Sequence, residues 1–218
     1  MVTEKAAQAS KEVSVILLRE GQKYTITDKE TGSKAMAPIQ VAEGNAVEVV
    51  KVDKGLIKKL PEGKNICDSL VYTVKDEKHN LNITWLIELK GSDSEKLVKH
   101  CVDQIMDTIG FLVDEVNFPT AKKYLKQRDL VFAAIAGAPD KTIPVLSNSD
   151  IRGLCRKLQA LSLQRKKIKN MSTLFFYIQP DSRVKNVEVR GAQAPYVIRC
   201  YNNRGGLITY PDALLKML

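Results

Sequence analysis

The chain lacks the cysteine patterns that zinc proteins and disulfide-rich proteins need. Its four cysteines stand apart at positions 67, 101, 155 and 200, with no C-x-x-C pair. This spacing excludes the common zinc motifs, and four scattered cysteines are not a disulfide framework in a chain of 218 residues. We therefore expect buried free thiols in a reducing compartment, which favours a cytoplasmic location.

Histidines and long apolar runs are also scarce. His79 and His100 are the only two histidines, too few and too far apart for a histidine-centred metal site. No apolar run approaches the roughly 20 residues of a membrane-spanning helix, and residues 1–12 have no apolar core of the kind that a signal peptide requires. The sequence thus predicts neither a membrane partner nor export.

Positive charge is present in excess, but it is confined to one part of the chain. The formal net charge is +9, from 34 Lys+Arg and 25 Asp+Glu. Residues 152–204 hold 12 basic and two acidic residues, whereas the rest of the chain has 22 basic and 23 acidic residues. A solvated face would explain basic residues in general, but this asymmetry favours binding of a polyanion. The candidate phosphate contacts are Arg152, Arg156, Arg165, Lys166, Lys167 and Lys169.

The apolar patterns predict a single α/β domain over residues 1–218, with 44% hydrophobic residues to form its core. Short β-branched or apolar runs predict strands at 13–18, 24–27, 47–52, 66–74, 82–90, 130–136, 174–178, 187–189, 196–201 and 207–209. Stripes at helical spacing predict helices at about 92–110, 119–127 and 147–169. We further expect a hairpin over 13–27, a loop over 28–38, and antiparallel pairing of 66–74 with 82–90.

Charged residues lie at the ends of two of these strands. Burying a charge there costs free energy unless a metal ion, a partner or water compensates it. Glu88 and Lys90 point to the same face of one strand, about 6.6 Å apart along it, and Asp68 on the neighbouring strand can face Glu88. Two converging carboxylates repel unless a cation separates them, and Mg²⁺ (or Mn²⁺) prefers oxygen ligands. A metal-activated water with a lysine beside it suits phosphodiester hydrolysis.

The pattern Asp68…Glu88-Leu89-Lys90-Gly91, followed by an amphipathic helix and a buried strand, resembles the PD-(D/E)XK nuclease superfamily over about residues 47–136. The resemblance implies a restriction-endonuclease-like fold, a mixed central sheet flanked by helices, here with extra N-terminal and C-terminal strands. It also implies a Mg²⁺-dependent endonuclease acting on DNA, in a superfamily whose members often act as homodimers. By resemblance, Asp68, Glu88 and the Leu89 carbonyl would hold the metal, Lys90 would be the catalytic lysine, and Gln104 would lie near the site.

The chain also departs from the pattern of that superfamily. Cys67 stands where the motif has its proline, and no helix is predicted before Val47 to supply a further acid, so Glu48 is the nearest substitute. The basic region 147–218 lies outside the shared core and would be a substrate-binding elaboration. Three alternatives remain open: an ordinary ion pair between Glu88 and Lys90 at a strand exit, a non-catalytic nucleic-acid-binding or complex-assembly module that retains the fold, and, less favoured, RNA in place of DNA as the substrate.

Overall fold

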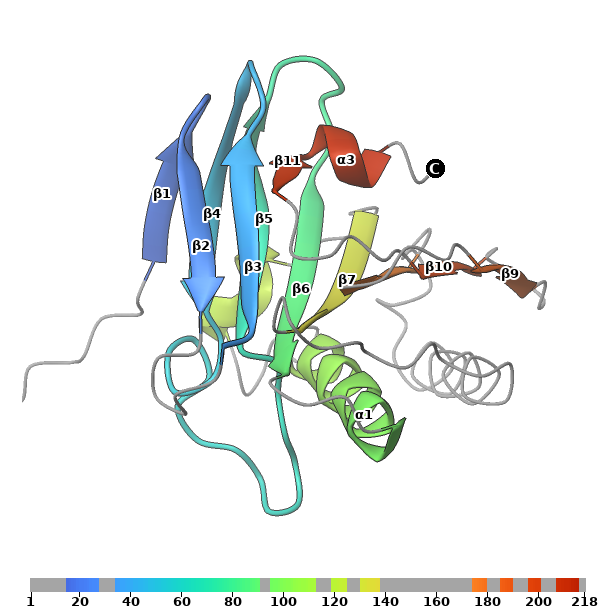
Figure 1. Ribbon diagram of the computed structural model, residues 1–218. Helices are drawn as coiled ribbons and strands as arrows, with labels where there is room; N and C mark the ends of the chain where they lie inside the picture. Colours follow the sequence, from blue (N-terminus) through green and yellow to red (C-terminus); the bar gives the residue numbers. More distant parts are fainter. Residues whose placement is uncertain are drawn as a thin grey trace, which may run out of the picture.

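A six-stranded mixed sheet forms the centre of the molecule (Figure 1). The computed structural model describes residues 15–27, 34–90, 95–112, 119–124, 130–137, 174–179, 185–189, 196–200 and 207–215. In spatial order the central strands are β1 (Val15–Arg19), β4 (Asn45–Lys51), β5 (Ser69–Asp76), β6 (Ile83–Lys90), β7 (Leu130–Gly137) and β8 (Leu174–Gln179). The class predicted from the sequence, α/β with a mixed sheet, is confirmed at this level.

The direction of the strands follows from how the chain connects them. The pairs β1–β4, β4–β5 and β5–β6 are antiparallel, whereas β7 is parallel to β6 and β8 is parallel to β7. A parallel pair needs a long crossover, and the helix α1 (Glu95–Leu112) lies in the crossover between β6 and β7. The antiparallel pairing predicted for 66–74 and 82–90 is confirmed, and so are the helix and the buried strand that follow.

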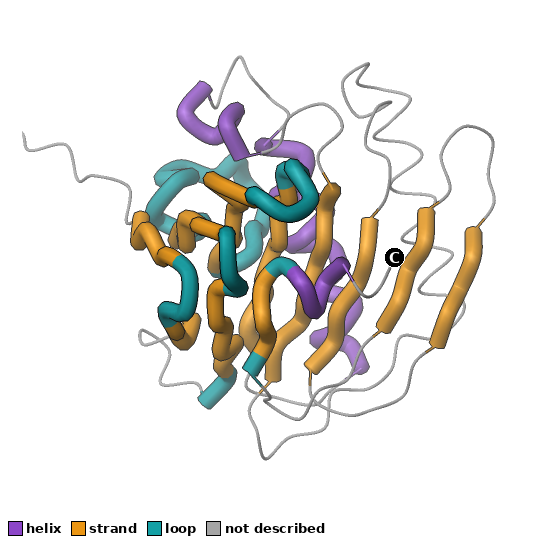
Figure 2. The backbone as a smooth tube through the Cα atoms, turned by 90° about the horizontal axis from the view of Figure 1, so that it is seen from above, coloured by secondary structure: helices purple, strands orange, loops and turns teal. Residues whose placement is uncertain are grey.

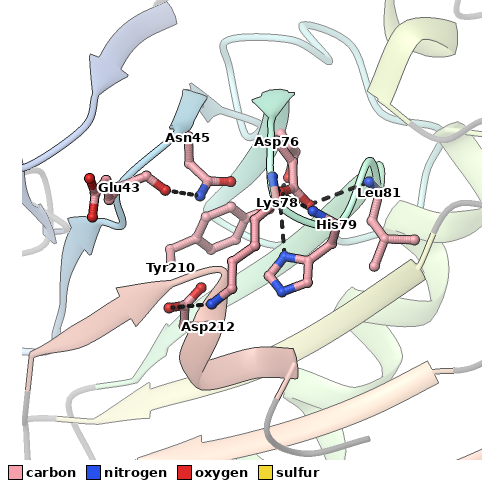
Figure 3. Close-up of polar contacts among 9 residues, drawn as sticks. Glu43, Asn45, Asp76, Lys78, His79, Leu81, Tyr210 and Asp212 are labelled. Atoms are coloured by element: carbon pink, nitrogen blue, oxygen red, sulfur yellow. Dashed lines mark hydrogen bonds and ion pairs between the residues drawn. The ribbon is translucent and has the colours of Figure 1, made fainter.

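The turn between β5 and β6 is closed by one buried carboxylate (Figure 3). Asp76 accepts hydrogen bonds from the backbone N–H groups of Lys78 at 3.1 Å, His79 at 2.9 Å and Leu81 at 3.3 Å. An aspartate that binds the backbone just after it replaces the ladder bonds that a turn lacks. Asn80 takes the left-handed conformation, with φ of 52°, which asparagine tolerates well. This end of the hairpin is therefore fixed.

A second, three-stranded sheet covers one face of the central sheet. It consists of β2 (Lys23–Thr27), β3 (Met36–Val41) and β11 (Ile208–Tyr210), with β3 in the middle. The main apolar cluster lies between the two sheets, where the Trp85 indole stacks on the Tyr210 ring at 6.1 Å between centroids. The Tyr210 hydroxyl donates to the Ile83 carbonyl at 3.0 Å and lies 2.9 Å from Thr73 Oγ1. Trp85 and Tyr210 are therefore core residues, and Tyr210 is no candidate for nucleic-acid contact.

The opposite face of the central sheet carries α1 and the 3₁₀ helix η1 (Pro119–Tyr124). The predicted apolar stripe of α1 is buried at each position whose side chain is described, namely Cys101, Ile105 and Ile109. η1 is fixed by an edge-on contact between the Tyr72 and Tyr124 rings, 5.6 Å between centroids, and by a hydrogen bond from Thr84 Oγ1 to the Tyr124 carbonyl.

Two predictions near the N-terminus are wrong. The strands predicted as a hairpin over 13–27 lie in different sheets, because β1 pairs with β4 and β2 pairs with β3. The predicted loop 28–38 ends earlier than expected, because β3 begins at Met36. The predicted loop includes Pro38, a residue that is rare in inner strands. The described pairing of β3 with β11 starts at Ile39, one residue after Pro38. The missing N–H of Pro38 therefore breaks no hydrogen bond in the described pairing of these two strands.

The C-terminal strands extend the row of strands beyond β8. β9 (Lys185–Val189) and β10 (Tyr196–Cys200) pair antiparallel, and β10 lies beside β8 (Figure 2). These positions agree with the strands predicted from the sequence. α3 (Asp212–Leu215) follows β11. The helix predicted over 147–169 lies outside the described residues, as do the six candidate phosphate contacts between Arg152 and Lys169.

Candidate functional site

The structure brings Asp68, Glu88 and Lys90 together at one edge of the central sheet. Glu88 and Lys90 are in the last three residues of β6, and Asp68 directly precedes β5. Because Ser69 pairs with Ile87, the next position of each strand places Asp68 opposite Glu88. The three residues most important to the sequence prediction are therefore neighbours in space.

Asp68 is held by the backbone of β6 and by that of Val52, the residue after β4. Its carbonyl accepts from Val52 N–H at 2.9 Å, and its carboxylate Oδ2 accepts from Leu89 N–H at 2.7 Å. The N–H of the preceding residue, Cys67, turns instead to Thr108 Oγ1 at 2.8 Å. The regular backbone pairing between β5 and β6 thus ends at this point. Beyond it, the Asp68 carboxylate accepts the hydrogen bond of the Leu89 N–H in place of a backbone carbonyl.

Glu88 is an acid in an apolar setting. Its side chain is 1% exposed; Oε1 lies 2.7 Å from Lys90 Nζ, and Oε2 has no hydrogen-bond partner among the described residues. Burial, and then the charge of Asp68, raise the pKa of Glu88 to about 8, and the attraction of Lys90 only partly opposes them. Near neutral pH the carboxyl group therefore holds a proton for much of the time, unless a cation joins the site.

Lys90 remains positively charged beside it. The Lys90 side chain is 22% exposed, so burial lowers its pKa, but the coulombic attraction and hydrogen bond of Glu88 outweigh burial and leave the pKa above 10.5. Lys90 is an ammonium group throughout the physiological range. In this state it can donate a hydrogen bond to a phosphate oxygen or to a water.

Helix α1 fixes the segment that leads into Asp68. Gln104 Nε2 donates to the Ile66 carbonyl at 3.1 Å, and Thr108 Oγ1 donates to the Gln104 carbonyl at 2.8 Å while it accepts from Cys67 N–H. Gln104 Oε1 is buried and has no hydrogen-bond partner in the described part of the chain. The resemblance implies that Gln104 lies near the site. In the structure Gln104 contacts Ile66, which is two residues before Asp68 in the sequence.

Two cysteines and a threonine, Cys67, Cys101 and Thr108, also surround the site, and only Cys67 is part of the predicted motif. Cys67 and Cys101 are buried free thiols, as predicted. Burial, and then the charge of Glu88, raise the pKa of Cys101 to about 12, and burial raises the pKa of Cys67 further still. Both thiols therefore stay protonated and act as small apolar neighbours of the acids. Thr108 lies four residues after Gln104, one turn along α1, and that spacing is the only signal that could have indicated it.

The site offers oxygen atoms that a hard divalent cation prefers, but few of them. Within the described ranges no group of three or more His, Cys, Asp and Glu side chains is arranged to hold a metal ion. The expected set is smaller, with two carboxylates and the carbonyl of Leu89. The N–H and C=O of a strand residue face the same neighbour, so the Leu89 carbonyl faces the side of Asp68. A cation beside the unpartnered Glu88 Oε2 would favour the ionised form that burial now disfavours.

Glu48 lies away from these residues. It is on β4 in register with Tyr72, and Tyr72 is in register with Thr84, four residues before Glu88 along β6. That offset is about 13 Å at the usual rise of a strand. Its carboxylate Oε2 also pairs with Lys123 Nζ at 2.8 Å. Glu48 is thus not placed to complete the ligand set, and the site has the two acids that the spacing predicted.

Comparison with known proteins adds no relative. No family model, no curated protein and no solved structure matches this chain. Among the helices described, none is both long enough and apolar enough to cross a membrane. The interpretation of the site therefore depends on its own geometry and chemistry.

Proposed function

We propose that this chain is a Mg²⁺-dependent nuclease of the PD-(D/E)XK type that hydrolyses phosphodiester bonds in DNA. The observation that carries the proposal is the meeting of Asp68, Glu88 and Lys90 at one sheet edge, with one oxygen of Glu88 buried and unpartnered. An acid pair with a single adjacent ammonium group is the set that this reaction needs, because it can hold a cation and still present a positive charge to a phosphate.

Each residue would have a separate role in that reaction. Asp68, Glu88 and the Leu89 carbonyl would hold Mg²⁺, which supplies an acidic bound water and neutralises charge on the phosphate. Lys90, charged at neutral pH, would orient the attacking water and stabilise the negative charge that develops on the phosphorus centre. Gln104 would position the Ile66–Asp68 segment and offer its buried Oε1 to a water.

The order of elements around the site also supports the proposal. The antiparallel pair β5 and β6 carries the acids, α1 packs against β6 and β7, and β7 joins β6 in parallel. This is the arrangement that the resemblance implies for the catalytic core. We propose the restriction-endonuclease-like fold on this ground, with β1, β8 and the three-stranded sheet as additions.

A second candidate function is a nucleic-acid-binding module without catalysis. It is favoured by the burial of Glu88, whose contact with Lys90 can be satisfied without any ligand. It is also favoured by α1, which directs Cys101 and Gln104 rather than an acid toward the site, while Asp107 pairs with Lys64 at 2.8 Å. Such a module would bind nucleic acid in a salt-dependent way without metal-dependent turnover.

Cleavage of duplex DNA by the purified chain, in Mg²⁺ and in EDTA, separates the two candidates. We expect Glu88→Gln and Lys90→Ala each to lower the cleavage rate by at least a hundredfold. Lys75 and Glu77 offer a matched control, because they form an ion pair with the same spacing at the other end of β5 and are 61% and 60% exposed. Lys75→Ala and Glu77→Gln should cleave as the wild type does. Equal cleavage by all variants would refute the assignment, and binding without cleavage would favour the second candidate.

A further inference from the structure

The connection between β4 and β5 lies at the same sheet edge as the candidate site. β4 ends at Lys51 and β5 begins at Ser69, and these two residues are paired, so the connection leaves and returns at the edge where β6 ends. Figure 1 shows it below the sheet, beside the arrowhead of β6. Its last residue before β5 is Asp68 itself. Both ends of this connection are therefore close to Glu88 and Lys90.

Residues 51–64, which we call the lysine loop, carry a local excess of positive charge. The loop has five lysines and two acids, whereas the chain outside residues 152–204 is nearly balanced between basic and acidic residues. Four of the lysines are exposed, namely Lys54, Lys58, Lys59 and Lys64. The loop contains no aromatic residue that a base could stack on. Its chemistry is therefore that of phosphate contact, not of base recognition.

The base of the lysine loop is anchored, so its lysines have a defined place. Leu56 and Ile57 are buried, and their N–H groups donate to the carbonyls of Lys51 and Val52 at 2.9 and 3.0 Å. Gly55 is required for this tight path, since a Cβ there would lie 2.3 Å from the Lys51 carbonyl oxygen. A surface that is already ordered loses less conformational entropy when it binds.

The far part of the lysine loop is anchored as well. Lys64 N–H donates to the Pro61 carbonyl at 3.1 Å across a turn, and Lys64 Nζ lies 2.8 Å from Asp107 Oδ1 on α1. Lys58 and Lys59 thus lie between two fixed points, the buried Ile57 and the turn at Pro61. Both residues are exposed, in the connection whose two ends lie at the edge that bears the acids.

We propose that the lysine loop is a binding surface for the phosphate backbone of duplex DNA, beside the bond that the candidate site would cut. This inference rests on the proposed function for the identity of the polyanion, and it adds a binding surface that the sequence analysis did not assign. Lys58 and Lys59 contact phosphates electrostatically and without reading the sequence. Lys64 mainly holds the loop to α1.

Binding of a labelled DNA duplex to the full chain, measured by fluorescence anisotropy in EDTA at several salt concentrations, tests the proposal. We expect Lys58→Gln/Lys59→Gln to weaken binding and to lower the slope of log K against log salt by about 2. The control is Lys75→Gln/Lys78→Gln, which removes the same charge at the opposite sheet edge and should leave the slope unchanged. All four replaced lysines are exposed, so both variants should fold as the wild type does. Urea unfolding checks this.

Each result decides the proposal. A loss confined to the Lys58/Lys59 variant supports it, whereas equal losses in both variants, no loss in either, or no binding of duplex by the wild type overturn it. Cleavage of the same duplex in Mg²⁺, run in parallel, keeps the two proposals apart. Loop-dependent binding without cleavage would refute the nuclease and support the lysine loop. Cleavage with unchanged binding by the loop variant would do the reverse.

Discussion

The backbone N–H of Leu89 donates a 2.7 Å hydrogen bond to the carboxylate of Asp68, so the acid that precedes β5 is bonded to the residue between Glu88 and Lys90. Through this bond, two segments 21 residues apart act as one rigid group, since Asp68 cannot move without breaking its bonds to β6 and to Val52. Preorganised charges of this kind act without reorganisation when a ligand arrives. Their effect on the free energy of unfolding can therefore be measured in the protein without a ligand.

Glu88 should make the stability of the protein fall as pH rises. The folded protein keeps the Glu88 proton up to about pH 8, whereas the unfolded chain releases it near the ordinary value of 4.5. Between these values the folded state binds more protons, so the free energy of unfolding from this group falls by about 1.4 kcal/mol per pH unit. Urea unfolding in EDTA at pH 5, 6, 7 and 8 measures the slope.

The Glu88→Gln variant should lose that part of the slope, because glutamine does not titrate. The exposed Glu62 provides the control, and Glu62→Gln should keep the wild-type slope. Lys90 does not contribute to the slope, since its raised pKa matters only above 10.5, where its stabilising contribution is lost. Identical slopes for wild type and Glu88→Gln would show that Glu88 is already ionised in the folded protein.

Mg²⁺ should stabilise the wild type more at pH 8 than at pH 6. The ion competes with a proton for Glu88, and the proton is bound more firmly at the lower pH. A ligand present at about ten times its Kd raises the free energy of unfolding by about 1.4 kcal/mol. Thermal unfolding with MgCl₂, against KCl at the same ionic strength, measures the effect. The Asp68→Asn variant keeps an acceptor for Leu89 N–H but should lose the stabilisation; if it keeps all of it, the ion binds elsewhere.

Thr108→Val should destabilise the protein by about 1–3 kcal/mol, because the N–H of Cys67 would be left buried without its acceptor. Thr108 is fully buried, so water cannot replace the lost bond. Thr108→Ser keeps the hydroxyl group and loses one methyl group, which costs about 1 kcal/mol. Urea unfolding of the three proteins at one pH compares them. A Val variant as stable as the Ser variant would show that the bond contributes little.

Tyr210→Phe should cost about 1–3 kcal/mol and leave Mg²⁺ binding unchanged. The variant removes the hydroxyl group that bonds Ile83 and Thr73, on the sheet face opposite α1. Trp85 is the only tryptophan of the chain and stacks on Tyr210, so its fluorescence reports unfolding of this contact directly. If Mg²⁺ stabilised the Tyr210→Phe variant less than the wild type, the two faces of the sheet would be coupled, contrary to this prediction.

Local patterns predicted those parts of the fold whose signal lies in neighbouring residues. The two strands of the β5–β6 hairpin, the stripe of α1 and the apolar run of β7 each show their period within one short segment. The site residues Asp68, Glu88 and Lys90 could be found for the same reason, since strand alternation and hairpin pairing settle which side chains share a face.

The rest depends on contacts between distant segments. β3 contains Pro38 and pairs with the three-residue strand β11 from the other end of the chain, so no local pattern indicates the three-stranded sheet. The separation of β1 from β2 likewise follows from their partners, not from their own residues. Thr108 and Cys101 join the site only through the way α1 docks on the sheet, which a hydrophobic stripe does not specify to the residue.

The pairing of β11 with β3 has a consequence for synthesis of the protein. β3 and β6 leave the ribosome long before Tyr210 is added, so the nascent chain must wait for the ring that covers Trp85. Until then, an apolar surface of the growing chain is open to chaperones or to misfolding. This core can therefore close only after residues 207–215 have left the ribosome.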